Sequence, residues 1–320
     1  MKAAAIDRFG PPSALELNDL PVPKPAPNEV LIALTASGVG VWDADIRKGW
    51  WPRGRPAFPL VLGTDGAGTV AAKGARVRRF SIGERVWAYE LANPKGGFYA
   101  EYVAVNAAHV GRVPPRLDLL HAGAAAVTAL TALQGVDDIL GVRRADTVLV
   151  FGATGAVGTL ALQFAKLRGA RVIATATGRR ATRLVLSLGA ATAFDPRQED
   201  AVDRLRELAP TGLDAALILA GGETLDRCLN LIKPRGRVAY PHGVEPEPKR
   251  RRRRFSMRGY DAEATARHFA RLERAADDAR LRVPIAAVYP LSQAARAHER
   301  LEHGHVIGRI VLRMRRAVAA

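Results

Sequence analysis

Cysteine is nearly absent from this chain of 320 residues, which contains a single one, Cys228. One thiol excludes an intrachain disulfide and any metal cluster that needs several cysteine ligands. Cys228 lies in the segment 225–232, where it is most simply a small buried apolar residue. Because 48% of the residues are hydrophobic, the chain can bury a sizeable core without cross-links.

The sequence also lacks a long uninterrupted hydrophobic run. The uncharged stretch 148–165 is long enough for a membrane span, but its internal glycines favour a buried strand, turn and helix. Residues 1–10 mix charged and apolar side chains and show no charged segment followed by an apolar one. We therefore expect a cytoplasmic protein that does not enter a membrane.

Acidic residues are scarce relative to basic ones: 31 Asp and Glu stand against 48 Lys and Arg, for a formal net charge of +17. Arginine carries most of the excess and is scattered through every segment. The exception is the run 249–254 (KRRRRR), which is typical of a solvated surface loop and, alternatively, of a site for phosphate backbones or anionic surfaces. We expect nucleic-acid binding there to be weak, non-specific and lost near physiological ionic strength.

Glycine is abundant after one predicted buried strand. The β-branched run Thr147–Phe151 predicts that strand, and Gly152, Gly155 and Gly158 follow it before an apolar helical pattern. The first glycine permits a tight turn, the second lets a pyrophosphate approach the backbone, and the third lets the helix pack on the sheet. With a second strand at 171–177, the spacing GxxGxxG predicts a dinucleotide-binding unit whose phosphate contacts helix N–H groups.

An acid is missing where a site for NAD normally has one. No Asp or Glu occurs between Asp146 and Asp195, so none directly follows the second strand to hold a ribose 2′-hydroxyl. Arg179 and Arg180 stand there instead, and guanidinium groups match a 2′-phosphate in charge and geometry. The sequence therefore predicts NADP(H) as the cofactor, with a solvated basic helix start as the alternative.

The order of the predicted elements indicates two domains. Residues 1–118 contain short strands broken by glycine and proline, which predict a β-rich domain of barrel type. Strands then alternate with helices over residues 119–268, as in a parallel doubly wound sheet. Residues 269–320 break this alternation, and we expect them to rejoin the first domain.

Seven segments together resemble the medium-chain dehydrogenase/reductase superfamily, and within it the zinc-free quinone oxidoreductase and zeta-crystallin group. They are 38–49 (GVGVWDADIRKG), 62–68 (LGTDGAG), 80–87 (FSIGERVW), 97–102 (GFYAEY), 124–133 (AAAVTALTAL), 152–158 (GATGAVG) and 307–312 (IGRIVL). The resemblance covers nearly the whole chain. It implies an α/β fold in which a doubly wound parallel Rossmann sheet is inserted in a β-rich GroES-like catalytic domain, with the nicotinamide in the cleft between them. It also implies a homodimer, joined along the candidate edge strand 255–259.

The chain departs from zinc-dependent relatives at their metal-ligand positions. Gly40 stands where they have a cysteine, and Thr64 and Asp65 stand where they have a His-Glu pair. These residues cannot form a thiolate–imidazole site, so no metal is expected. The lobe that holds structural zinc in those relatives is shortened to 91–97, and Val41 replaces the tyrosine proton donor of some enoyl-reducing relatives.

The resemblance implies hydride transfer from NADPH to a quinone or to the β-carbon of an α,β-unsaturated carbonyl compound. It places Thr128 beside the nicotinamide, with solvent or Asp45 as the proton source; the alternatives are a threonine that satisfies its own helix and a solvated loop acid. Trp42, Trp50 and Trp51 are predicted to line an apolar substrate pocket, with ordinary packing as the alternative for Trp42. The predicted cofactor-binding residues are Gly152, Ala153, Thr154, Gly155, Ala156, Val157, Gly158, Thr177, Arg179, Arg180, Gly221, Gly222, His242, Gly243 and Arg309.

A second class of function is open at this point. A binding protein can keep the nucleotide fold and act through its basic surface on RNA or another polyanion. Turnover of enones and quinones would separate this class from a reductase. The loop positions that shape the substrate pocket match no subclass, so the sequence leaves the substrate unnamed.

Overall fold

The computed structural model describes residues 1–52, 54–249 and 255–314, which form two compact units. Unit 1 contains Met1–Val127, Ala264–Asp277 and the described residues from Val283 onward. Unit 2 contains Thr128–Glu263 and Asp278–Arg282. The predicted insertion of one folding unit within another is therefore confirmed.

Unit 1 is organised around the long strand β3 (Glu29–Val39), most of whose residues are buried. One edge of β3 pairs antiparallel with β5 (Asp65–Lys73), and the other edge pairs with β7 (Tyr102–Asn106) and β16 (Arg309–Arg313). The apolar core includes side chains from both ends of the chain, and removing them from water stabilises the unit. The other strands are β1 (Lys2–Ile6), β2 (Glu16–Asp19), β4 (Leu60–Val61), β6 (Arg85–Tyr89), β8 (Val110–Arg112) and β15 (Ile285–Pro290).

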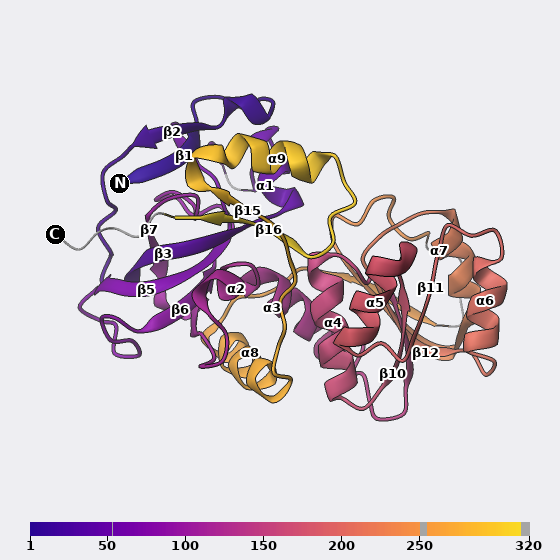
Figure 1. Cartoon of the computed structure of the whole chain (residues 1–320). Helices are drawn as coiled ribbons and strands as arrows, with labels where there is room; N and C mark the ends of the chain where they lie inside the picture. Colours follow the sequence, from indigo (N-terminus) through magenta and orange to yellow (C-terminus); the bar gives the residue numbers. More distant parts are fainter. Residues whose placement is uncertain (53, 250–254, 315–320) are drawn as a thin grey trace. The chain divides into compact units, whose positions relative to one another are not determined.

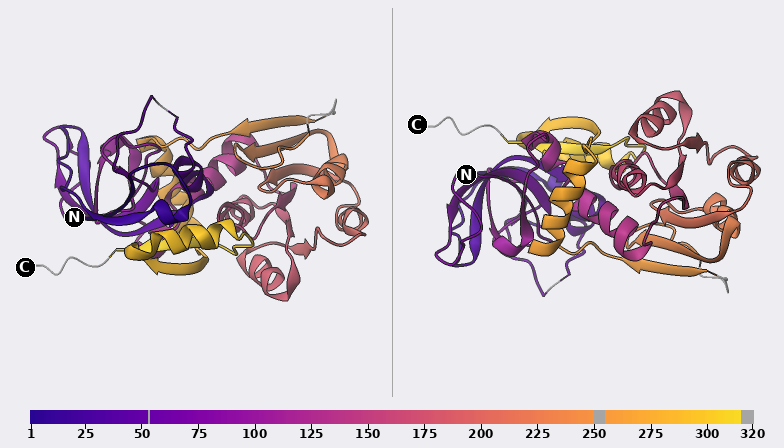
Figure 2. Two further views of the ribbon diagram at one scale, coloured as in Figure 1. Left: turned by 90° about the horizontal axis from the view of Figure 1, so that it is seen from above. Right: turned by 90° about the horizontal axis from the view of Figure 1, so that it is seen from below.

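The C-terminal segment rejoins unit 1, as the sequence predicts. Strand β16 pairs with β3 so that Ile310 lies opposite Val39 and Leu312 lies opposite Ser37. Helix α9 (Ala294–Glu302) precedes this strand. Figure 1 shows β16 beside β3, and both views of Figure 2 show the yellow C-terminal segment against the indigo N-terminal strands.

Unit 1 extends to Val127 and resumes at Ala264, because two helices pack on it. Helix α2 (Leu119–Gly123) approaches β3 so closely that a Cβ atom at Gly123 would lie 2.5 Å from the Ala36 carbonyl oxygen. Helix α8 (Ala266–Asp278) brings Phe269 within 2.6 Å of where a Cβ atom of Gly111 would be. The alternation of strands and helices along the sequence does not reveal either contact.

Unit 2 is built on a six-stranded parallel sheet with the strand order β11-β10-β9-β12-β13-β14. This order confirms the predicted doubly wound sheet, and β14 confirms the predicted edge strand near 255–259. The chain leaves β9 in one direction and returns to β12 in the other, so right-handed crossovers put helices on both faces. Helices α4 and α5 pack together, and so do α6 and α7 (Figure 1). The elements are α3 (Ala126–Gln134), β9 (Thr147–Phe151), α4 (Ala156–Leu167), β10 (Arg171–Thr175), α5 (Gly178–Leu188), β11 (Thr192–Phe194), α6 (Ala201–Leu208), β12 (Leu213–Ile218), α7 (Glu223–Cys228), β13 (Ile232–Pro241) and β14 (Ser256–Tyr260).

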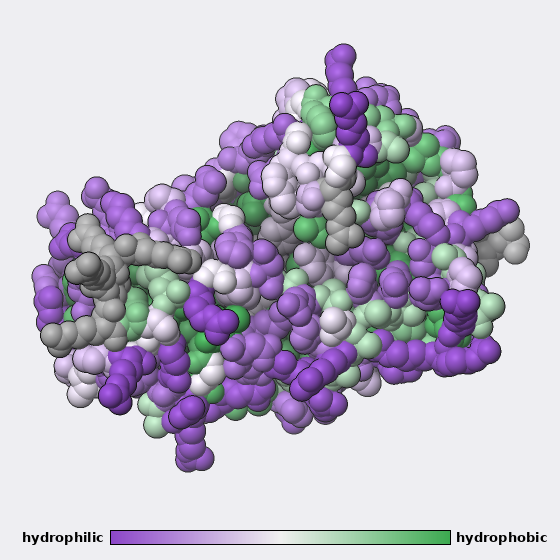
Figure 3. Space-filling model, turned by 180° about the vertical axis from the view of Figure 1, so that it is seen from behind, coloured by the Kyte–Doolittle hydropathy of each residue, from purple (hydrophilic) through white to green (hydrophobic). Residues whose placement is uncertain are grey.

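The described residues form neither a long apolar helix nor, on the face drawn in Figure 3, a continuous apolar surface. Within the described part of the chain, no helix is both long and apolar enough to cross a bilayer. Hydrophilic residues cover most of the face drawn in Figure 3, and hydrophobic ones show as scattered patches between them. Of the basic run 249–254, only Lys249 belongs to the described residues, so the prediction of weak nucleic-acid binding falls almost entirely outside them.

Candidate functional site

The predicted cofactor-binding residues gather at one edge of the sheet in unit 2, with the exception of Arg309 in unit 1. They follow the carboxyl ends of β9, β10, β12 and β13, and these strands run parallel. The carboxyl edge of such a sheet is where this fold binds nucleotides. The structure thus brings together residues that lie far apart in the sequence, such as Gly152 and Gly243.

The three glycines after β9 differ in what the fold demands of them. Gly152 has a φ of +85° and donates its N–H to the Thr175 hydroxyl at 2.8 Å, which fixes the turn. A Cβ atom at Gly158 would lie 2.5 Å from the Gly152 carbonyl oxygen, so α4 can pack there only without a side chain. At Gly155 a Cβ atom would make an ordinary 3.6 Å contact. The fold itself therefore requires Gly152 and Gly158 but does not require glycine at 155, whose predicted role toward a pyrophosphate stays a prediction.

The start of α5 carries the predicted contacts to a 2′-phosphate. Arg179 and Arg180 are exposed in its first turn, and neither has an ion-pair partner within the described ranges. Thr177, the residue before the helix, donates its hydroxyl to the Asp195 carboxylate at 3.0 Å. Sequence reasoning missed Asp195, because it sought an acid directly after β10. The acid follows β11 instead, and the pairing of β11 with β10 brings it to the same edge.

A surface cavity of about 690 Å³ lies at the end of β13. A Cβ atom at Gly221, after β12, would lie 2.0 Å from the Pro246 carbonyl oxygen, so only glycine fits beneath the loop that forms the cavity. His242 Nδ1 lies 2.9 Å from an Asp261 carboxylate oxygen, with both side chains exposed. The cavity is lined by Tyr240, His242, Gly243, Val244, Glu245, Pro246 and Glu247.

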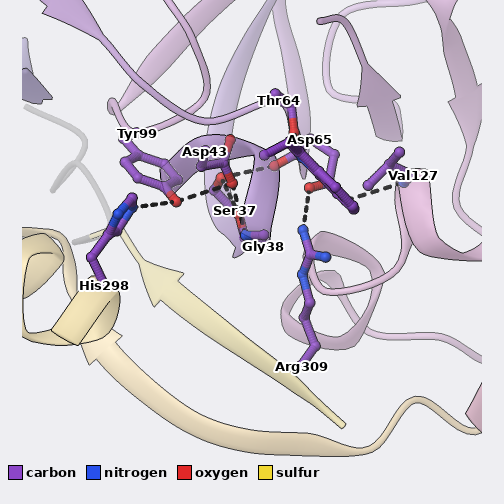
Figure 4. A network of polar contacts seen from close by, with 11 residues as sticks. Ser37, Gly38, Asp43, Thr64, Asp65, Tyr99, Val127, His298 and Arg309 are labelled. Carbon is purple, nitrogen blue, oxygen red and sulfur yellow. Dashed lines mark hydrogen bonds and ion pairs between the residues drawn. The ribbon is translucent and has the colours of Figure 1, made fainter. Parts of the chain in front are cut away.

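In unit 1, a buried ion pair stands beside the positions at which zinc-dependent relatives hold their metal. Arg309 is 4% exposed and donates to the Asp65 carboxylate at 2.9 Å, and the Val127 N–H donates to the second carboxylate oxygen at 3.1 Å (Figure 4). Burial raises the pKa of Asp65, and Arg309 opposes that rise. The Asp65 partner of Arg309 belongs to unit 1, so the predicted contact of Arg309 with the cofactor stays a prediction.

The indole of Trp42 contacts both Gly40 and Thr64, two of the positions at which the sequence departs from zinc-dependent relatives. Its Nε1–H donates to the Thr64 hydroxyl at 2.6 Å. A Cβ atom at Gly40 would lie only 2.7 Å from the indole, so the ring occupies the place of any side chain at residue 40. The Arg309 guanidinium lies 5.3 Å from the centre of the Trp42 ring, within the range of a cation–π contact.

A second buried chain of polar contacts begins at Asp43, which sequence reasoning passed over in favour of Asp45. The Tyr99 hydroxyl lies 3.2 Å from an Asp43 carboxylate oxygen and 3.1 Å from His298 Nε2, so it joins the two (Figure 4). On the other side of the imidazole, the fully buried Arg47 donates to His298 Nδ1 at 3.3 Å. Asp43 also accepts from the Gly40 N–H at 2.8 Å.

The charges in this chain of contacts are set by burial. Desolvation raises the pKa of Asp43 to about 7, although Arg309 and the Gly40 hydrogen bond act in the opposite direction. Desolvation, followed by the positive charge of Arg47, lowers the pKa of His298 to about 3. At neutral pH the imidazole is therefore neutral, and Asp43 is near the midpoint of its titration.

The predicted catalytic and substrate residues are less closely grouped. Asp45 is exposed on α1 (Val41–Arg47), and Thr128 is buried at the start of unit 2. Trp50 is half exposed, and Trp51 packs against the core of unit 1. Trp42 bonds Thr64 and Trp51 packs against the core, and the role of Trp42, Trp50 and Trp51 in a substrate pocket stays a prediction.

Comparisons with known proteins agree with this architecture. A family model described as an alcohol dehydrogenase GroES-like domain matches residues 26–115, and one described as a zinc-binding dehydrogenase matches residues 188–312. A quinone oxidoreductase of Lama guanicoe is 32% identical, over 98% of this chain and 97% of its own.

Solved structures give the same picture. An NAD-dependent alcohol dehydrogenase superposes with a TM-score of 0.89 at 32% identity, covering 98% of this chain and 99% of its own. The Escherichia coli quinone oxidoreductase complexed with NADPH superposes with a TM-score of 0.84 at 25% identity, covering 98% and 100%. A GroES-like unit with an inserted Rossmann sheet and a glycine-rich nucleotide edge defines a dehydrogenase or reductase. The chain belongs to the medium-chain dehydrogenase/reductase family, within its quinone oxidoreductase-like group.

Proposed function

We propose that this oxidoreductase transfers a hydride from NADPH to a quinone or to an α,β-unsaturated carbonyl compound, and that it does so without zinc. The observation that carries the choice of cofactor is the pair of exposed guanidinium groups, Arg179 and Arg180, at the nucleotide edge of unit 2. The NADPH complex of the Escherichia coli relative supports it. The NAD-dependent relative of similar fold makes a direct test of cofactor preference necessary.

The residues at the edge of unit 2 fit a dinucleotide. Gly155 leaves room for a phosphate group at the start of α4, whose first N–H groups point toward such a ligand. The arginine pair would hold the 2′-phosphate by charge-assisted hydrogen bonds. When bound, the dihydronicotinamide supplies the hydride. Thr128 is proposed to orient its ring, and a proton from solvent or from Asp45 completes the two-electron reduction.

Exchanging both arginines for acids tests the cofactor assignment. The double variant Arg179→Asp/Arg180→Asp is expected to lower the ratio of NADPH to NADH affinity by tenfold or more, since each charged hydrogen bond contributes about 1.5–3 kcal/mol. Fluorescence titration of each nucleotide measures the two dissociation constants. Arg204→Asp/Arg206→Asp on α6 is a matched control, because it makes the same charge change at exposed positions of unit 2. An unchanged ratio would show that the arginines do not bind the 2′-phosphate and would leave Asp195 as the ribose contact of an NAD enzyme.

The residues at the former metal position do not fit zinc. Trp42 occupies the space at Gly40 and bonds Thr64, and Arg309 neutralises Asp65, so no set of thiolate, imidazole and free carboxylate exists there. Elsewhere in the described ranges no group of three or more His, Cys, Asp or Glu residues can hold a metal.

Elemental analysis tests metal independence. Protein purified without an affinity tag is expected to contain far less than one zinc per chain and to keep its activity after treatment with a chelator. Protein incubated with a zinc salt and then gel-filtered serves as the control for adventitious binding. Stoichiometric zinc that is lost together with activity would contradict the assignment.

A homodimer is proposed from the edge of the sheet in unit 2. Among the residues that the structure describes, strand β14 pairs with β13 on one side only, and open sheet edges invite pairing with another chain. Size-exclusion chromatography with light scattering is expected to give twice the 34.3 kDa of one chain. A mass of one chain at micromolar concentration would exclude the dimer.

A further inference from the structure

A threonine hydroxyl joins the ends of two neighbouring strands at the nucleotide edge of unit 2. Thr175, the last residue of β10, is 4% exposed, and its hydroxyl oxygen accepts the Gly152 N–H at 2.8 Å. The two residues are 23 positions apart in the sequence. They meet because β10 pairs in parallel with β9, with Ala174 opposite Val150. The function proposed above gives Thr175 no role.

Gly152 is the residue on which the turn after β9 depends. Its φ of +85° is in the left-handed region that favours glycine. A Cβ atom there would lie 3.0 Å from the carbonyl carbon of Leu219, directly after β12, so that side of the turn is closed. On the side of α4, the Gly152 carbonyl oxygen lies 2.5 Å from where a Cβ atom of Gly158 would be. Neighbouring segments thus confine Gly152, and Thr175 supplies the hydrogen bond that orients its N–H group.

The turn sets the position of the first residues of α4, where the proposed function puts a phosphate group. The Gly155 N–H donates to the Gly152 carbonyl oxygen at 3.3 Å, and Gly155 directly precedes α4. The Thr159 N–H then donates to the Gly155 carbonyl oxygen at 3.0 Å. Backbone groups that are ordered before a ligand arrives lose less entropy when it binds. Without an acceptor for the Gly152 N–H, other conformations of the turn would gain, because a buried N–H group needs a partner.

A second threonine near the end of the same strand holds a different part of the edge. Thr177 donates its hydroxyl to the Asp195 carboxylate at 3.0 Å, and it directly precedes α5, which carries Arg179 and Arg180. Thr175 bonds the turn that would hold the pyrophosphate, which NADPH and NADH share. Thr177 instead belongs to the segment that would meet the 2′-phosphate of NADPH alone. Loss of the Thr175 hydroxyl should therefore differ in its effect from loss of the arginine pair.

We propose that Thr175 is a positioning residue for the nucleotide: by accepting the Gly152 N–H, its hydroxyl holds the glycine turn in the form that binds the pyrophosphate. This inference rests on the proposed function and adds to it a residue that governs affinity for NADPH and NADH alike. Thr175 acts through Gly152 and does not touch the reacting atoms. Loss of the acceptor is therefore expected to weaken nucleotide binding and to leave the turnover rate of the bound complex unchanged.

Replacing the hydroxyl by a methyl group tests this role. Thr175→Val keeps the β-branched shape of the side chain but cannot accept the Gly152 N–H. Fluorescence titration is expected to give dissociation constants about tenfold higher for both NADPH and NADH, with their ratio unchanged. The KM for NADPH should rise by a similar factor, while kcat at saturating NADPH stays at the wild-type value. Thr175→Ser, which retains the hydroxyl, should bind both nucleotides as the wild type does.

Thr192→Val is the matched control. Thr192 is the first residue of the adjacent parallel strand β11, so it makes the same exchange at the opposite edge of the sheet. Its dissociation constants for both nucleotides should equal those of the wild type. Far-UV circular dichroism gives the thermal midpoint of each variant, so that binding is compared at a temperature at which all of them are folded.

The outcomes separate this inference from the proposed function. If the wild type binds NADPH and Thr175→Val binds both nucleotides as tightly, the inference is overturned, although the proposed function stands. A loss confined to NADPH would assign Thr175 to the 2′-phosphate end and would also overturn the inference. If the wild type binds neither nucleotide, the proposed function and the inference fail together. Thr175→Cys, whose thiol is a weak acceptor, serves if Thr175→Val does not fold, and a smaller loss of affinity for both nucleotides is then expected.

Discussion

The variant Arg47→Met is expected to lose about 3 kcal/mol of the free energy of unfolding of unit 1, because it removes one member of a buried ion pair. The Arg47 side chain is 0% exposed and donates to the Gly10 carbonyl, to His298 Nδ1 and to the Glu302 carboxylate. Methionine fills a similar volume but removes the Arg47 hydrogen bond to each of these acceptors. This loss of stability is at the lower end of the range for broken buried ion pairs, because Glu302 is 31% exposed and its carboxylate still has the Lys48 ammonium group at 3.0 Å.

Urea unfolding followed by tryptophan fluorescence measures this loss in unit 1 alone. All four tryptophans of the chain belong to that unit: Trp42, Trp50, Trp51 and Trp87. Arg8→Met is the control, because Arg8 is exposed near the same turn and its exchange is expected to change stability by at most about 0.5 kcal/mol. An Arg47→Met variant within about 1 kcal/mol of the wild type would show that these buried contacts contribute little net stability.

The variant Asp43→Asn is expected to gain stability relative to the wild type as the pH rises from 4 to 7. The pKa of Asp43 rises from 3.8 to about 7 on folding, so between these values the folded state keeps a proton that the unfolded state has lost. The contribution of Asp43 to wild-type stability therefore falls with rising pH in this window, by up to about 1.4 kcal/mol for each pH unit. Asparagine removes this dependence and can still accept from the Gly40 N–H.

His298 contributes with the opposite sign. Its pKa falls from 6.5 to about 3 on folding, so its contribution to stability is lost as the pH falls through that window. In the wild type the slopes of Asp43 and His298 oppose each other, and Asp43→Asn is expected to leave a net rise of stability toward pH 6.5.

Tryptophan-monitored urea unfolding at several pH values measures the difference. Asp45→Asn, an exposed change on the same helix, is the control and should run parallel to the wild type. Parallel profiles of Asp43→Asn and the wild type would mean that Asp43 titrates as an ordinary carboxyl.

Local patterns predict the fold well, whereas they do not predict contacts between distant segments. The strand at Thr147–Phe151, the glycine spacing after it and the closing strand Arg309–Arg313 are each encoded by neighbouring residues. Arg47 and His298 are 251 positions apart, and no local pattern couples them. One local pattern does indicate a structural role for Asp43. It lies three residues after Gly40, the residue before α1, and an acid at this position can accept a hydrogen bond from the Gly40 N–H.

The strand order and the packing decide the remaining features of the site. Asp195 reaches the nucleotide edge because β11 lies beside β10, which the sequence order of strands does not fix. Trp42 was predicted to face a substrate pocket, and its hydrogen bond to Thr64 depends on how tightly Gly40 lets the indole approach. Such contacts depend on the assembled sheet rather than on spacing along the chain.

Oxidation of NADPH, followed by its absorbance with a panel of quinones and enones, tests the central claim most directly. The purified, zinc-free protein is expected to reduce at least one of these acceptors with a clear preference for NADPH over NADH, and Arg179→Asp/Arg180→Asp should lose that preference. No turnover with any quinone or enone, by protein that binds NADPH, would contradict the assignment as a reductase of this class.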